Sequence, residues 1–406
     1  MGYTYIEGSV TAPKGFTAAG IHCGIRKNKT KRDLALIFCE KKCTAAAVYT
    51  TNLVKSSPIT VTKKNLEDGY AQAVIVNSGN ANTCNADGME KAELMCSLAA
   101  EKLGISPEDI IVGSTGVIGQ ILPIEPIRDG MEQLVSELSV DGATNAAEAI
   151  MTTDTISKEV AVETVIAGKT VRVGGISKGS GMIHPNMATM LCFVTTDAAV
   201  SADMIRKAVK SAADKTFNMI SIDGDTSTND TLSVMASGLA GNPEITEENE
   251  DYEIFLEALT AVCRGLARMM AKDGEGATKL LTCKVSGAKT EKDAKGVAKS
   301  VICSSLLKAA MFGADANWGR VLCAIGYSGC DVDVNKVDVA FASEAGRIDV
   351  CKNGAGIDFS EEIAKSILIK DEIDIIVDLN DGEGTAEAYG CDLTYEYVKI
   401  NGDYRT

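Results

Sequence analysis

The most informative segment of the chain is KGSGMIHPNMATML, residues 178–191. Its glycines are followed by Pro185 and then by Thr189, a hydroxyl residue that opens an apolar run. Proline fixes its own backbone angle, and this constraint would hold the peptide between Ala188 and Thr189 in a bend. Such a bend suits attack by the Thr189 hydroxyl on the carbonyl just before it. If the resulting ester were hydrolysed, Thr189 would become a new N-terminus, although the spacing alone favours a threonine that merely begins a strand.

A threonine at a new N-terminus would carry its own base. The α-amine has a pKa of about 7.7 to 8.0, against about 10.4 for lysine, so part of it is neutral at pH 7. A neutral amine can accept the proton of the hydroxyl on the same residue. This chemistry needs no histidine, and the chain has only His22 and His184. Zinc sites built on several imidazoles and most Ser-His-Asp arrangements therefore lack their usual parts.

Residues 178–191 closely resemble the self-cleavage site of the ornithine acetyltransferase family, also called glutamate N-acetyltransferases or arginine-biosynthesis bifunctional proteins. Further matches are spread along the chain. They are VNSGNANTCNADG from Val76, GSTGVIGQ from Gly113, TTDT from Thr152, SIDGDTSTND from Ser221, DGEGATKL from Asp273, GADANWGR from Gly313 and NGDYRT from Asn401. The resemblance covers essentially all 406 residues, and a chance match in this order is improbable.

The resemblance implies cleavage between Ala188 and Thr189, with Thr189 as the nucleophile and the first residue of the new chain. Thr115 and Gly116 match the pair that stabilises the oxyanion. A hydroxyl and a backbone N–H in one loop can donate to a single oxyanion, and one such donor is typically worth about 2.7–4 kcal/mol. The residues that match substrate contacts are Thr152, Lys178, Thr189, Glu275, Asn401 and Thr406.

An amino-acid substrate carries a carboxylate and an ammonium group. Lys178 can pair with the carboxylate and Glu275 with the ammonium group, and this division of roles is our hypothesis. Contacts from Asn401 and Thr406 would require the C-terminus to fold back over the site. Without the resemblance, these residues would be taken as a solvated lysine, a surface glutamate and a frayed tail.

The resemblance also implies an activity and an assembly. The activity is ping-pong acetyl transfer from N2-acetyl-L-ornithine to L-glutamate, in the cyclic pathway of arginine biosynthesis. No metal or organic cofactor is implied, although some members of the family also accept acetyl-CoA as donor. An alpha chain of residues 1–188 and a beta chain of residues 189–406 should stay associated, as a heterotetramer of two of each. The expected fold is an α/β sandwich of two β-sheets between helical layers, as in the DmpA-like aminopeptidases.

Short strand-like runs alternate with helical patterns. The apolar, β-branched runs 73–78 and 110–115 end in small polar residues, as buried strands leading into functional loops do. Two alternating runs predict a hairpin over 160–179, and a strand follows from Met190. Helices are predicted over 86–103, over 201–215 and over a segment that ends at 271.

The pattern changes after about residue 285. Strands are predicted at 338–343 and 372–379, and the alternation of residues 393–400 predicts another. We therefore expect a C-terminal αβ unit over roughly 285–406.

The charge balance argues against polyanionic partners. Lys and Arg number 40 against 56 Asp and Glu, a formal net charge of −16 at pH 7, and such a surface repels nucleic-acid backbones and anionic lipid. No apolar run approaches the length of a membrane-spanning helix, and the N-terminus lacks the pattern of a secretory signal. The 13 cysteines include no CxxC pair, which fits reduced thiols. We expect a cytoplasmic protein without nucleic-acid or membrane partners.

Other local interpretations are weaker. Residues 175–179 fit the G-x-S-x-G pattern of a nucleophilic Ser177, but the glycines and the proline that follow would break the required helix. Residues 223–230 resemble a calcium loop, but Thr228 stands where the turn needs glycine, which favours a loop fixed by side-chain hydrogen bonds. We expect His184 to pack or hydrogen-bond rather than to catalyse.

Two alternative functions remain. A self-processed aminopeptidase or amidase of related fold would use the same Thr189 but transfer the acyl group to water. A non-catalytic acidic binding protein would stay uncut.

Overall fold

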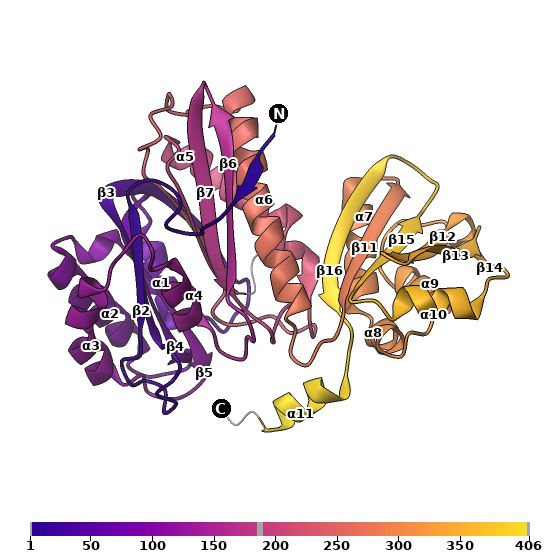
Figure 1. Ribbon diagram of the computed structural model, residues 1–406, viewed down its shortest axis with the longest axis horizontal. Helices are drawn as coiled ribbons and strands as arrows, with labels where there is room; N and C mark the ends of the chain where they lie inside the picture. The colour runs from indigo at the N-terminus through magenta and orange to yellow at the C-terminus, as the bar shows by residue number, and fades with distance from the viewer. Residues whose placement is uncertain (1, 185–189, 404–406) are drawn as a thin grey trace.

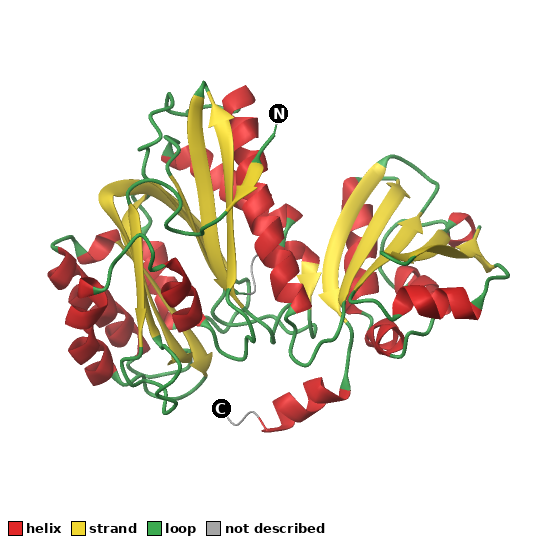
Figure 2. Cartoon of the chain, in the orientation of Figure 1, coloured by secondary structure: helices red, strands yellow, loops and turns green. Residues whose placement is uncertain are grey.

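The structure is a computed structural model that describes residues 2–184 and 190–403. Figure 1 shows two units side by side, with the long helix α6 (Glu250–Lys272) between them. The first unit is built on a nine-stranded sheet and the second on a seven-stranded sheet. Figure 2 shows how helices and strands alternate in both units, so the predicted α/β fold class is confirmed.

The first sheet runs in the order β1-β6-β7-β8-β10-β3-β4-β5, and β2 pairs with β3. Its strands are β1 (Thr4–Ile6), β2 (Phe16–Ile21), β3 (Leu34–Tyr49), β4 (Tyr70–Asn80), β5 (Ile110–Val117), β6 (Lys158–Ile166), β7 (Lys169–Lys178), β8 (Leu191–Thr196) and β10 (Thr231–Ala236). β8 pairs with β10 in parallel, and so does β4 with β5. The predicted strands at 73–78 and 110–115 and the hairpin over 160–179 are confirmed.

One long strand, β3, makes this sheet fold back on itself. The first part of β3 pairs with β2 and β4, the last part pairs with β10, and the register against β4 shifts between Phe38 and Cys43. Ile37 in the first part and Ala45 in the last part both point into one inner core. The two expected β-layers are therefore present, but they form one hydrogen-bonded sheet, because a strand of 16 residues is long enough to pass from one layer to the other.

The inner core lies between the two layers of the folded sheet. Phe16 and Val74 come from one layer, Phe193 comes from the other, and all three side chains are buried. Helix α4 (Ala143–Ile150) adds alanine side chains to the same core. The outer faces are covered by α1 (Ser57–Asn65), α2 (Gly88–Leu103) and α3 (Ile124–Ser136) on one layer and by α5 (Ala202–Lys215) and α6 on the other. The result is the predicted sandwich of two β-layers between helical layers.

The second sheet runs in the order β14-β13-β12-β15-β11-β16-β9. Its strands are β9 (Ile220–Ser221), β11 (Leu280–Ala288), β12 (Asp338–Ser343), β13 (Gly346–Lys352), β14 (Ala355–Gly356), β15 (Glu372–Asp378) and β16 (Gly384–Cys391). The helices beside it are α7 (Glu291–Cys303), α8 (Ser305–Phe312), α9 (Trp318–Gly326) and α10 (Glu361–Leu368). Short 3₁₀ turns lie at η1 (Pro107–Asp109), η2 (Phe217–Met219) and η3 (Val334–Lys336). The predicted strands at 338–343 and 372–379 are confirmed as β12 and β15.

The C-terminal segment differs from the sequence prediction. The alternation of residues 393–400 predicts a strand, but the structure has a helix, α11 (Tyr395–Asp403), and none of its nine residues is buried. A strand needs a neighbouring strand for its backbone hydrogen bonds, and α11 lies apart from both sheets in Figure 1. The helix instead contacts the rest of the protein through Tyr397 and Asn401, which are one turn apart on one face.

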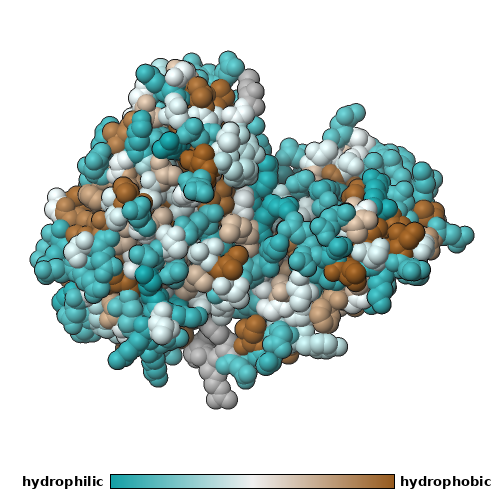
Figure 3. Space-filling model, viewed as in Figure 1, coloured by the Kyte–Doolittle hydropathy of each residue, from teal (hydrophilic) through white to brown (hydrophobic). Residues whose placement is uncertain are grey.

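The surface shown in Figure 3 is largely hydrophilic, with hydrophobic side chains in small separate groups. Scattered apolar side chains of this kind are normal on a protein surface. Within the part of the chain that the structure describes, no helix combines the length and the hydropathy needed to cross a bilayer.

A buried ion network connects three segments of the first unit. Lys158 Nζ lies 2.7 Å from Asp154 Oδ1 and 2.6 Å from Asp273 Oδ2. The side chains of Lys158 and Asp154 are fully buried, and that of Asp273 is 5% exposed. Asp154 Oδ1 also accepts the backbone N–H of Gly179 at 2.7 Å. The start of β6, the turn after β7 and the end of α6 are therefore held together by charged groups that water does not reach.

Lys158→Met should lower the free energy of unfolding by about 3–5 kcal/mol, because it leaves two carboxylates buried without their common partner. Lys169→Met is the matched control, since Lys169 is exposed at the start of the neighbouring strand β7. Denaturant unfolding of the two variants and the wild type measures the difference. Equal stability of the two variants would show that the network contributes nothing.

Candidate active site

One cavity brings together six of the residues that the sequence predicts as functional. It has a volume of about 170 Å³ and is lined by residues from β5, β7, α11 and the loops beside them. The predicted residues in its wall are Thr115, Gly116, Thr152, Lys178, Glu275 and Asn401. The predicted residues Ala188, Thr189 and Thr406 lie outside the described residues.

Thr115 and Gly116 lie at the end of β5, beside a bulge in β4. Gly116 has a φ of +133°, and a Cβ at this position would lie 2.4 Å from the carbonyl carbon of Gly79. Only glycine fits such a backbone. The Thr115 side chain is 7% exposed and its residue lines the cavity. The close approach of the two strands therefore fixes Thr115 and Gly116 together at the cavity wall.

Lys178 is the last residue of β7 and is only 9% exposed. Its ammonium group forms no ion pair with any residue that the structure describes. Burial lowers the pKa of Lys178, although the nearby carboxylates of Asp154, Asp230 and Glu275 act in the opposite direction. A buried cation at the wall of a cavity, without a direct carboxylate partner, is suited to bind the carboxylate of a ligand.

Glu275 follows α6 and is held by its backbone and by its side chain. Its N–H donates to the carbonyl of Ser180 at 2.7 Å, and its Oε2 accepts the Asn401 Nδ2–H at 2.8 Å. A Cβ at Gly181 would lie 2.4 Å from Glu275 Cδ, so glycine leaves room for the carboxylate. Asn401 belongs to α11 and lines the cavity, so the C-terminal segment returns to the cavity as far as Asn401, as predicted.

Thr152 lies in the loop after α4 and is placed by the buried ion network. Its N–H donates to Asp154 Oδ2 at 2.9 Å. The neighbouring hydroxyls of Thr153 and Ser180 lie 2.7 Å apart. Burial acts to raise the pKa of the Asp154 carboxyl, but Lys178, Lys158 and backbone donors together hold it well below its usual range. Asp154 is therefore an anion that supports both the Thr152 loop and Lys178.

The loop of residues 221–230 supplies residues to which the sequence assigns no role. Asn229 Nδ2 donates to the carbonyls of Ala81 and Ser114 at 2.7 Å each, so it joins the segment after β4 to strand β5. Asp230 is fully buried, its Oδ2 has no hydrogen-bond partner among the described residues, and burial raises its pKa well above the usual value. The motif SIDGDTSTND contains both residues, but their contacts depend on distant segments that no local pattern reveals. The loop is fixed by side-chain hydrogen bonds, as predicted.

The weaker local interpretations have clear outcomes. Ser177 is fully buried inside β7, not exposed at a turn into a helix, so the serine-hydrolase interpretation is wrong. His184 Nδ1 lies 3.1 Å from Ser221 Oγ and 3.4 Å from Cys303 Sγ. Burial, together with the nearby Lys299, lowers the pKa of His184 to about 4. His184 is therefore a neutral hydrogen-bonding residue at pH 7, as predicted.

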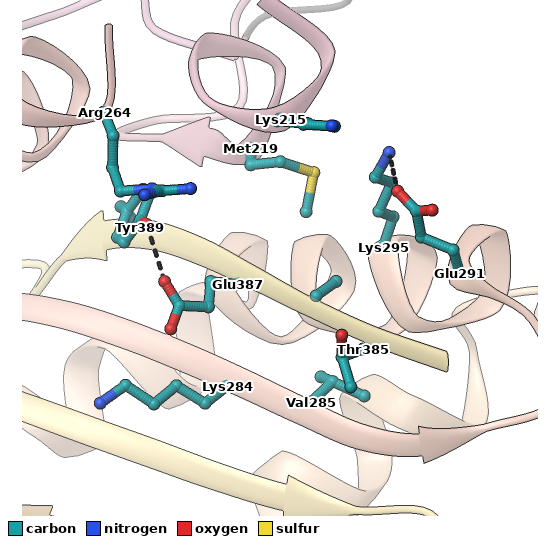
Figure 4. A pocket seen from close by; sticks show the side chains of 11 residues that line it. Lys215, Met219, Arg264, Lys284, Val285, Glu291, Lys295, Thr385, Glu387 and Tyr389 are labelled. Atoms are coloured by element: carbon teal, nitrogen blue, oxygen red, sulfur yellow. Dashed lines mark hydrogen bonds and ion pairs between the residues drawn. The ribbon is translucent and has the colours of Figure 1, made fainter. Parts of the chain in front are cut away.

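A separate and larger cavity, of about 400 Å³, lies between the two units. Figure 4 shows that it is lined by residues of α5, α6, α7, β11 and β16, with Lys295 paired to Glu291 and Tyr389 bonded to Glu387. It contains none of the predicted functional residues, and its size alone does not make it the reaction site. Over residues 2–184 and 190–403, no group of three His, Cys, Asp or Glu side chains is arranged as metal ligands.

Comparisons with known proteins point to one family. The sequence model of the ArgJ family matches residues 17–406. The arginine biosynthesis bifunctional protein ArgJ of Symbiobacterium thermophilum is 52% identical over 404 residues, 99% of this chain and 100% of that protein. The protein of the same name from Caldanaerobacter subterraneus subsp. tengcongensis is 50% identical over 402 residues, 99% of each chain.

A solved structure agrees with these matches. The crystal structure of the arginine biosynthesis bifunctional protein of Bacillus halodurans is 48% identical to this chain, with a TM-score of 0.50. The alignment covers 52% of this chain and 98% of the solved one. From these matches and the arrangement of the cavity, the chain belongs to the ArgJ family.

Proposed function

We propose that this protein is a glutamate N-acetyltransferase that moves an acetyl group from N2-acetyl-L-ornithine to L-glutamate. The observation that carries the proposal is the single cavity that brings together Thr115, Gly116, Thr152, Lys178, Glu275 and Asn401. These residues are distributed over nearly 300 positions of the sequence, yet they meet at one wall. Relatives at about 50% identity over the whole chain are arginine biosynthesis bifunctional proteins by name.

The enzyme first cleaves itself. The Thr189 hydroxyl attacks the carbonyl carbon of Ala188, the peptide C–N bond breaks, and the Ala188 acyl group moves from nitrogen to oxygen. Water then hydrolyses this ester, which gives Ala188 a carboxylate and leaves Thr189 with a free amine and a free hydroxyl. The solved Bacillus halodurans chain aligns with 52% of this chain. Residues 189–406 make up a little over half of the 406 residues, so the solved chain has the length expected of one product of the cut.

The two products should stay together. β7 ends at Lys178, before the cut, and β8 begins at Leu191, after it. The two strands pair in antiparallel fashion over six residues each, from Val173–Thr196 to Lys178–Leu191. Cleavage therefore leaves the sheet intact. The heterotetramer of two alpha and two beta chains is part of this proposal and comes from the family resemblance.

Acetyl transfer then proceeds in two steps through Thr189. The neutral α-amine accepts the hydroxyl proton, the oxygen attacks the acetyl carbonyl of N2-acetyl-L-ornithine, and Thr115 and Gly116 donate to the oxyanion. Collapse breaks the C–N bond, the amine of ornithine leaves with the proton, and an acetyl ester remains. The amine of L-glutamate attacks that ester in the second step, which gives N-acetyl-L-glutamate and restores Thr189.

Charge complementarity explains how the cavity takes an amino acid. Lys178 binds the substrate carboxylate, and Glu275, oriented by Asn401, binds a substrate ammonium group. No metal or organic cofactor takes part in this mechanism. Acetyl-CoA as a second donor is consistent with the word bifunctional in the names of the relatives.

Thr189→Ala should abolish both cleavage and acetyl transfer, because it removes the only hydroxyl that serves both reactions. Denaturing electrophoresis of the purified protein should show two bands for the wild type and one band near 42.6 kDa for the variant. Thr189→Ser keeps a hydroxyl and should retain some of each reaction. A wild-type protein that is fully active as an intact chain would contradict the proposal.

Thr115→Ala should lower kcat about 10²–10³-fold and change KM little, because its hydroxyl matters most when negative charge develops on the oxygen. Steady-state kinetics with acetylornithine as the varied substrate gives both constants. Ser97→Ala is a control on the outer helix α2, where the hydroxyl bonds only within its own helix. A Thr115→Ala variant with normal kcat and a raised KM would remove Thr115 from the oxyanion site.

An aminopeptidase or amidase of related fold is the second candidate, since it would use the same Thr189. Incubation with acetylornithine, with and without L-glutamate, separates the two activities. The transferase should release ornithine in quantity only when glutamate is present, and one N-acetylglutamate should form per ornithine. Ornithine and free acetate formed at the same rate without glutamate would favour the amidase.

A further inference from the structure

The three residues 182–184, which precede the cut, are bound to the loop of residues 222–226. The N–H of Ile222 donates to the carbonyl of Ile183 at 2.7 Å. The Thr226 hydroxyl donates to the carbonyl of His184 at 2.8 Å. Ile183 and Thr226 also form an antiparallel bridge. The backbone carbonyls of Ile183 and His184 are therefore bound by residues 222–226, which follow the cut in the sequence.

Asp223 makes the strongest part of this attachment. Its Oδ2 accepts the N–H of Met182 at 2.6 Å, and its Oδ1 accepts the N–H of Ile183 at 2.9 Å. Met182 has a φ of +55°, which is rare for a residue with a side chain. A residue in this conformation turns two successive N–H groups toward one point, where they can bind an anion. The Met182 side chain is 44% exposed, so packing does not explain the unusual backbone.

The strand that follows this loop, β10, binds the chain just after the cut. The N–H of Thr231 donates to the carbonyl of Met190 at 2.8 Å, and β10 continues beside β8 from that point. Residues 222–231 therefore hold His184 on one side and Met190 on the other, with only five residues between them in the sequence. His184 before the cut and Met190 after it are therefore bound by one continuous stretch of chain.

Asp223 also contacts the C-terminal helix. The phenol of Tyr397 on α11 donates to Asp223 Oδ2 at 3.3 Å. Burial and the Asp223 charge raise the pKa of Tyr397, which keeps the phenol protonated as a donor. Asn401, one turn further along α11, is bonded to Glu275 in the cavity. The carboxylate therefore connects the segment before the cut with the helix that reaches the substrate cavity.

We propose that Asp223 is a positioning residue for self-cleavage, which binds the backbone of Met182 and Ile183 and thereby fixes the chain that leads to the cut. This inference rests on the proposed function. Cleavage needs the hydroxyl and the carbonyl in one geometry, and a positioned pair of groups gains its rate from that orientation. The strained φ of Met182 is kept because the carboxylate binds the two N–H groups that it exposes.

The test follows cleavage in time. Wild type, Asp223→Asn and Asp225→Asn are made as full chains in a cell-free translation reaction, and samples taken at intervals are separated by denaturing electrophoresis. Asp223→Asn replaces one acceptor oxygen with a donor group and removes the charge, so cleavage should slow at least ten-fold. Asp225 is exposed two residues away, and its variant should cleave within two-fold of the wild-type rate. A wild type that stays uncut would refute the proposed function, whereas Asp223→Asn cleaving at the wild-type rate would refute only this inference.

The activity of the cleaved variant separates a positioning role from general damage to the fold. In Asp223→Asn, the kcat for acetyl transfer, counted per cleaved chain, should fall by much less than the cleavage rate, because Asp223 reaches the cavity only indirectly, through Tyr397 of α11. A loss of kcat as large as the loss of cleavage rate would overturn the inference.

Variants at Met182 test the backbone directly. Met182→Gly should cleave at least as fast as the wild type, because glycine adopts a positive φ without strain. Met182→Val should cleave at least ten-fold more slowly than Met182→Gly, because a branched side chain disfavours that φ. Equal rates for these two variants would also overturn the inference.

Discussion

The buried Lys158 ammonium, bonded to Asp154 and Asp273, is the contact on which the arrangement of the site depends. Taking three charges out of water is unfavourable unless each is paired in good geometry. The network meets this condition. The two carboxylates also accept the backbone N–H groups of Thr152, Thr155 and Gly179. Three loops that are separate in the sequence are therefore fixed at one point.

The position of this network explains the electrostatics of the cavity. Asp154 faces Lys158 on one side and acts on Lys178 on the other. Lys178 therefore lies close to an anion without forming a direct ion pair with it, at the wall of the cavity. Glu275 lies two residues after Asp273, so the same network fixes the opposite charge. A cavity with one cation and one anion at fixed positions recognises the two charged groups that an amino acid carries.

The sequence predicts those parts of the protein that depend on local pattern or on a shared motif. The strands β4 and β5, the hairpin of β6 and β7 and the helix α5 all follow from periodicity and turn residues. Thr115 and Gly116 are predicted by the resemblance of GSTGVIGQ to the family motif, since the residues alone would indicate only a tight glycine turn. The roles proposed for these residues remain predictions, and Thr189 lies outside the described residues.

Other features depend on contacts that no local pattern contains. The continuity of the two β-layers through β3 depends on which strands pair with it. The alternation of residues 393–400 likewise does not reveal that the segment lies away from both sheets and forms a helix. Asn229 and Asp223 act on backbone groups more than 35 positions away in the sequence. A motif can indicate that such a loop matters, but the partners of its side chains are visible only in three dimensions.

The most direct test of the account is mass spectrometry of the protein after brief exposure to N2-acetyl-L-ornithine without glutamate. The account predicts a beta chain that begins with Thr189 and gains about 42 Da, the mass added when one acetyl group replaces the hydrogen of the Thr189 hydroxyl. This added mass should be lost when glutamate is supplied. An active preparation in which no chain begins at Thr189, or in which the acetyl group is carried by another residue, would contradict it.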